Sequence, residues 1–197
     1  GSIPSYLCYE CSSMQTLVLP DSLIEIGNYA FENCTNLSGV VLPANLEVLG
    51  GRAFGSCTSL TEITIPKTLK TANTVGAFNQ APFHESGIKK AILEDGMVSV
   101  PANLFKEAAL LEKVTLPDSI TSIGSRAFEN CSALTHVRIP SSLETCGVHG
   151  AYNDGPFHGS GLISADVGYG VTVIPAYLFE GAGSLVDVDL PTSIISI

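Results

Sequence analysis

The sequence predicts a solenoid in which each coil adds one short β-strand to a parallel sheet. One pattern recurs along the 197 residues: LSGVVLPANLEVLGGRAFGSCTSL, which ends at Leu60, matches LEKVTLPDSITSIGSRAFENCSAL, which ends at Leu134. Successive copies are 23 or 28 residues apart, a period typical of repeat architectures. Each copy opens with alternating apolar and polar residues, which indicates a half-buried strand. The copies start at Gln15, Ser38, Thr61, Lys89, Glu112, Thr135, Ile163 and Val186.

A longer unit also repeats, because the spacings follow the order 23, 23, 28 and give a block of 74 residues. Duplication of three coils would produce this order. We expect residues 15–197 to form one solenoid domain of about eight coils. Residues 1–14 are expected to hold a tag remnant, Gly1–Ser2, and a partial repeat. The chain is expected to be a fragment of a larger protein, because solenoids need capped ends.

Each part of the repeat has a structural role. Proline closes most of the strands because it removes a ladder donor and turns the chain. A second apolar pair, such as Ile120 and Ile123, predicts a short strand on another wall. A short helical turn is expected next, ending in a phenylalanine of a stacked core column. That column contains Phe31, Phe54, Phe83, Phe105, Phe128, Phe157 and Phe179.

The six cysteines also fall into repeat positions. Three residues beyond the phenylalanine column, cysteine alternates with serine and alanine, which indicates a small buried slot. Cys11 belongs to this slot, and Cys8 takes a phenylalanine position. A zinc site at Cys8 and Cys11 would need a second ligand pair, and the sequence places none nearby. A disulfide between Cys34 and Cys57 is sterically conceivable, but parallel stacking disfavours it.

Composition narrows the function further. The net charge of −10 and pI of about 4.6 disfavour nucleic acid and anionic membranes as partners. No run approaches the roughly 18–20 apolar residues of a membrane helix, so we expect no membrane insertion by this segment. The sequence contains no recurring Ser/His/Asp constellation and no glycine-rich phosphate loop before a helix. We therefore expect no enzyme activity, no catalytic residues, no cofactor and no metal.

The repeat resembles the BspA-type leucine-rich repeats. The segments LTEITIPKTLKT, SITSIGSRAFENCSAL and VIPAYLFEGAGSL carry the resemblance, which covers about residues 7–197. It implies a secreted or cell-surface protein, commonly of host-associated bacteria or protist parasites, that acts in adhesion. No catalytic residues belong to the family pattern. The 28-residue coils depart from its common length.

The outward strand residues are candidates for ligand binding. A basic stripe is followed by an acidic group, within an acidic protein. One interpretation is a ligand-facing surface for an acidic protein or glycan, and the resemblance implies a ligand derived from the host. The other is a solvated face with ion pairs stacked between coils, each worth under about 1 kcal/mol. The candidate residues are Lys90, Lys113, His136 and Arg138, then Asp166, Asp187 and Asp189.

The two 28-residue coils provide a second candidate. Each has about six extra residues, so two bulges should project from one side, roughly 15 Å apart at the usual strand spacing. Phe78 and Tyr152 belong to these bulges. They are either binding knobs or rings folded back over the bulge, and we expect the second. His84 and His158 should lie too far apart to share a metal ion.

Three functions remain open on sequence grounds. A binding module is favoured, because the exposed face is charge-patterned. A passive structural spacer and a targeting segment of a larger secreted protein are the alternatives. The oligomeric state stays open.

Overall fold

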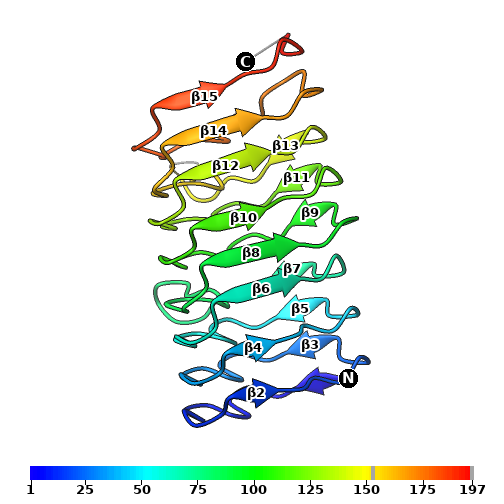
Figure 1. Ribbon diagram of the computed structural model, residues 1–197, viewed down its shortest axis with the longest axis vertical. Helices are drawn as coiled ribbons and strands as arrows, with labels where there is room; N and C mark the ends of the chain where they lie inside the picture. The colour runs from blue at the N-terminus through cyan, green and yellow to red at the C-terminus, as the bar shows by residue number, and fades with distance from the viewer. Residues whose placement is uncertain (152–153, 196–197) are drawn as a thin grey trace.

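The computed structural model describes residues 1–151 and 154–195, which form one stack of coils (Figure 1). The chain runs along the long axis from the N-terminal coil, in blue, to the C-terminal coil, in red. Each full coil carries one strand on a common wall, here called the strand face, and most carry a second short strand on an adjoining wall. The predicted solenoid is confirmed. In the described ranges no helix is long and apolar enough to cross a membrane.

The strand face consists of parallel strands paired in the predicted register. Glu62 lies beside Lys90, and Lys90 lies beside Lys113. Inward side chains such as Ile63 and Ile65 are fully buried, while the residues between them are exposed. The strands are β2 (Thr16–Leu17), β4 (Gly39–Val40), β6 (Glu62–Ile65), β8 (Lys90–Leu93), β10 (Lys113–Thr115), β12 (His136–Ile139), β14 (Ser164–Val167) and β15 (Asp187–Asp189).

The second wall confirms the short strand expected after each proline turn. Ile123 pairs with Val100 on one side and with Cys146 on the other, so Cys146 takes the same position in its coil as these apolar residues. Ser2 and Ile3 pair with Glu25 and Ile26 in the same way. The strands are β1 (Ser2–Ile3), β3 (Glu25–Ile26), β5 (Val48–Leu49), β7 (Thr71–Ala72), β9 (Ser99–Val100), β11 (Ser122–Ile123) and β13 (Thr145–Cys146).

The third wall, here called the turn wall, holds the phenylalanine segments. The prediction of a helical turn in these segments was wrong. Tyr29, Phe31 and Asn33 donate their N–H groups to carbonyls of the next coil at 2.9–3.0 Å. Glu32 and Cys34 instead donate to carbonyls three residues earlier in their own coil. Tyr29 and Asn33 take left-handed φ values of 57° and 59°, which an α-helix does not allow. Alternate amides thus join the coils, and no helix occurs among the described residues.

The core confirms the phenylalanine column and, at Cys34, Cys57 and Cys131, the small buried slot. Cys11, also predicted to lie in that slot, is exposed, because it belongs to the first coil, which no earlier coil covers. Neighbouring rings of the column stack at centroid distances of 5.1–6.0 Å. Cys57 Sγ donates to the carbonyl of Phe31 at 3.2 Å, and Cys131 Sγ donates to that of Phe105 at 3.1 Å. Burial raises the pKa of the Cys57 thiol to about 12. All six cysteines are free, and the stacked ones are unreactive packing residues.

The 74-residue block is visible as regular interruptions of both walls. Hydrogen-bonded pairing on the strand face stops between β4 and β6 and again between β10 and β12, immediately before each 28-residue coil. On the second wall it stops after β7 and after β13, immediately after the second strand of each long coil. The bulge of each long coil is closed by an antiparallel bridge, Val75 to Gln80 and His149 to Asp154.

Candidate ligand-binding face

The outward side chains of the strand face form two columns, and both contain predicted site residues. Strand pairing places neighbours within each column side by side, except across the unpaired junction between β10 and β12, although their sequence positions are 23 or 28 apart. The first column reads Glu62, Lys90, Lys113, His136, Ser164, Asp187. The second column reads Thr64, Ile92, Thr115, Arg138, Asp166, Asp189.

Ion pairs between coils occupy part of the basic stripe. Lys90 Nζ lies 3.0 Å from Glu62 Oε1. Arg138 donates from both terminal nitrogens to the carboxylate of Asp118, at 3.1 and 3.4 Å. The hydrogen bond from Arg138 holds the pKa of Asp118 below its usual range. Lys113, between them, has no ion pair within the described ranges. The free positive charge of the stripe is therefore concentrated at Lys113.

The acidic group follows the basic stripe on the next strands. His136 Nδ1 lies 2.9 Å from Ser164 Oγ, and its Nε2 lies 3.4 Å from Asp166 Oδ2. Asp187 pairs in register with Ser164, and Asp189 with Asp166, so three exposed carboxylates meet on two adjacent strands. The face consequently changes from positive to negative charge at β12–β14.

A shallow groove lies where pairing between β10 and β12 stops. Its volume is about 290 Å³, near the lower end of ordinary ligand sites. The two strands form no hydrogen-bonded ladder with each other along this junction. Three predicted site residues line it. The lining residues are Lys113, Val114, Thr115, Leu116, His136 and Arg138.

The turn wall carries a partly buried ionic network that sequence reasoning missed. It involves the residue that follows each phenylalanine of the core column. Lys106 is 3% exposed, and its Nζ lies 2.9 Å from Glu107 Oε1 and 3.8 Å from Glu129 Oε1. The column reads Glu32, Gly55, His84, Lys106, Glu129, His158, Glu180.

Two further groups, Arg126 and His84, belong to this network. Arg126 forms ion pairs with Glu129 and with Asp154. The hydrogen bond from Arg126 to Asp154 holds the pKa of Asp154 below its usual range. His84 Nδ1 lies 2.7 Å from Glu107 Oε2, outside hydrogen-bonding geometry. Burial and the nearby Arg52 lower the pKa of His84 despite this carboxylate.

A simple signal would have revealed the network in advance. Periodicity along each coil identifies strands and core positions. Comparison of one position across coils shows charged or histidine side chains after nearly every core phenylalanine. In a chain with only 14% charged residues, such a column indicates contacts between coils.

The bulges depart from expectation in one respect. The ring of Phe78 is 77% exposed, so the prediction that it folds back over the bulge was wrong. The bridge between Val75 and Gln80 closes the backbone, and Lys106 Nζ binds the carbonyl of Phe78 at 3.1 Å. These contacts fix the chain and leave the ring pointing away from it. Tyr152, the corresponding residue, lies outside the described residues.

Stacked coils with one parallel strand each define a leucine-rich-repeat solenoid. The chain belongs to the BspA-type leucine-rich-repeat family, whose model matches residues 1–81 and 76–197 in six copies. Such repeats are generally non-catalytic and generally mediate protein binding. A comparison with curated proteins finds no significant match.

Solved structures of similar fold come from bacteria. A leucine-rich repeat protein of T. pallidum is 26% identical, with a TM-score of 0.53, over 99% of this chain and 76% of its own. A leucine-rich cell surface protein of Faecalibacterium prausnitzii A2-165 is 24% identical, with a TM-score of 0.53, over 100% of this chain and 60% of its own. The chain thus shares its repeat fold with bacterial leucine-rich repeat proteins.

Proposed function

We propose that this chain is a non-catalytic, adhesin-like recognition module of a secreted or cell-surface protein, and that its strand face binds a protein or glycan. The observation that carries the proposal is the groove between β10 and β12, where Lys113, His136 and Arg138 converge. Inward residues are constrained by the core, whereas these outward residues are free to vary with the ligand.

The charge distribution favours a ligand with an acidic group opposite Lys113. Lys113 has no competing ion pair among the described residues, so its charge is available to a partner. The carboxylates of Asp187 and Asp189, three strands away from Lys113, favour a basic group on the same partner. Opposite charges arranged in this order give orientation and faster association rather than affinity alone.

The test is binding of the isolated chain to immobilised extracellular-matrix proteins and to a glycan array. For any ligand found, Lys113→Glu should slow association by about tenfold and change its salt dependence. Lys67→Glu is the matched control, because it makes the same charge change on the turn after β6. The proposal fails if Lys113→Glu and Lys67→Glu bind as the parent does.

A passive spacer is the second candidate, and the ion pairs favour it. Lys90 with Glu62 and Arg138 with Asp118 satisfy charges of the strand face within the chain. A spacer needs no ligand, so the parent chain would bind no member of the panel. The same screen therefore separates the two functions.

A further inference from the structure

The two 74-residue blocks carry different side chains at one place on the turn wall. In the first block, His84 is accompanied by Gln80 in its own coil and by Lys106 in the next. In the second block, the residues 74 positions later are His158, Asp154 and Glu180. An amide and an ammonium group have thus been exchanged for two carboxylates around one imidazole.

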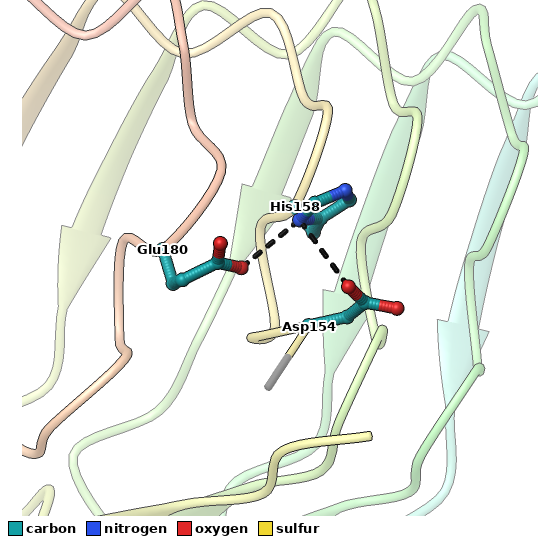
Figure 2. A group of neighbouring side chains, drawn as sticks. All are labelled: Asp154, His158 and Glu180. Atoms are coloured by element: carbon teal, nitrogen blue, oxygen red, sulfur yellow. Dashed lines mark hydrogen bonds and ion pairs between the residues drawn. The ribbon is translucent and has the colours of Figure 1, made fainter. Parts of the chain in front are cut away.

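These three side chains converge in the folded chain. Figure 2 shows His158 between the two carboxylates, with Asp154 from its own coil and Glu180 from the next. His158 Nδ1 lies 3.0 Å from Glu180 Oε2 and 3.8 Å from Asp154 Oδ1. One ligand atom from each residue lies within 4.8 Å of the others. Around a tetrahedral zinc ion with bonds of about 2.0–2.1 Å, ligand atoms are about 3.3 Å apart.

Neighbouring groups hold both carboxylates in place. Arg126 binds Asp154 through Oδ2, which leaves Oδ1 directed toward His158. The N–H of Gly155 lies 3.4 Å from Glu180 Oε2 and donates to it. Metal ligands in proteins are commonly oriented by partners of this kind.

Gly181 keeps the imidazole nitrogen accessible. It replaces Glu107 of the first block, whose carboxylate lies 2.7 Å from His84 Nδ1. A Cβ at position 181 would lie 2.1 Å from His158 Nδ1. Glycine at this position therefore leaves space at the nitrogen that Glu180 and Asp154 approach.

The first block contains its own cation at the corresponding place. The ammonium group of Lys106 is bound by Glu107, by Glu129 and by the carbonyl of Phe78, which belongs to the bulge. In the second block, the residue that corresponds to Lys106 is Glu180, so the chain places a carboxylate there in place of the ammonium group. A cation from solution would replace it and link the second bulge to the next coil.

We propose that Asp154, His158 and Glu180 form a site for a divalent first-row metal ion such as Zn²⁺. One imidazole and two carboxylates are suitable ligands, and three protein ligands leave a position for water. The net charge of −10 favours cation binding in general, but only this cluster presents three ligand atoms together among the described residues. This inference is independent of the proposed function.

The test is calorimetric titration of the whole chain with ZnCl₂. Cys8→Ser and Cys11→Ser are introduced first, because Cys11 is exposed and thiols bind zinc. This parent should bind one equivalent of Zn²⁺ and gain thermal stability from it. Glu180→Lys, which installs the residue found at Lys106, should weaken binding by at least about tenfold. Asp154→Asn should have the same effect.

His84→Gln is the matched control, because the first block has no such ligand set. This variant should bind Zn²⁺ as the parent does. Circular dichroism checks that each variant is folded. The proposal is overturned if the parent takes up no zinc, or if Glu180→Lys and Asp154→Asn bind with parental affinity. It is also overturned if His84→Gln alone abolishes binding.

Discussion

Lys106 illustrates how a single charge can be buried within a repeat core wall. Its side chain is 4% exposed and contacts two carboxylates and one carbonyl. A buried ion pair contributes little compared with an apolar replacement of both partners, but removal of one partner leaves an uncompensated charge. The contacts of Lys106 join the first bulge to the two coils that follow it.

Lys106→Met should lower the free energy of unfolding by about 2–4 kcal/mol, because Glu107 and the carbonyl of Phe78 then lose the ammonium group that binds them in a partly buried site. Urea unfolding followed by circular dichroism measures the change. Lys70→Met is the matched control: Lys70 pairs with Glu47 in solvent, so its loss should cost under about 1 kcal/mol. Equal effects of the two substitutions would contradict the burial of this ion pair.

His84 gives the folded chain a predictable response to acid. Its folded pKa is lowered, chiefly by burial, so the unfolded chain binds a proton more readily. The contribution of neutral His84 is fully present above the unfolded pKa of about 6.5 and is lost as pH falls below it. His84→Gln should therefore lose less stability than the parent between neutral and mildly acidic pH. Urea midpoints at several pH values measure this, and identical slopes would contradict the prediction.

Among elements, the strands and core columns were predictable, but the turn wall was not. Alternation of Ile63 and Ile65 with polar residues, and the fixed phase of phenylalanine, directly reflect which side chains are buried. The turn wall is held by amides of alternate residues and by left-handed residues such as Tyr29 and Asn33. Those contacts depend on the backbone of a neighbouring coil, which periodicity within one coil does not encode.

The corner of each long coil shows another constraint of this kind. In each long coil the segment between the small buried slot, held by Ser86 or Ser160, and the next copy of the repeat is one residue shorter than in the other coils. Glycine follows both serines. A Cβ at Gly87 would lie 2.1 Å from the carbonyl oxygen of Thr58, and one at Gly161 would lie 2.0 Å from that of Ser132. The shorter corner brings the two backbones close together.

Gly87→Ala should lower the free energy of unfolding by about 1–3 kcal/mol, because backbone cannot move aside as a flexible side chain can. Gly39→Ala is the matched control, since a Cβ there meets nothing within 4 Å, and its effect should stay within about 0.5 kcal/mol. Chemical denaturation compares both with the parent. Parental stability of Gly87→Ala would contradict the close approach of the coils.

At the scale of the whole molecule, the solenoid separates recognition from structural charge. The strand face presents exposed residues that differ between coils, while the turn wall uses its charges to join coils. Each coil mainly contacts its neighbours, so a surface change in one coil should leave the others intact. The candidate residues of the strand face were predictable from sequence, because outward strand positions follow from the repeat. Their partners were not: Arg138 binds Asp118 on the proline turn rather than a neighbouring strand.

The central claim is that a ligand contacts the strand face, and matched pairs of bulky substitutions test it most directly. Thr64→Arg with Thr115→Arg blocks that face, while Thr71→Arg with Ser99→Arg makes the same change at exposed positions of the second wall. Binding to the matrix-protein and glycan panel should be lost for the first pair and retained for the second. Loss with the second pair only, or no change with either, would contradict the claim.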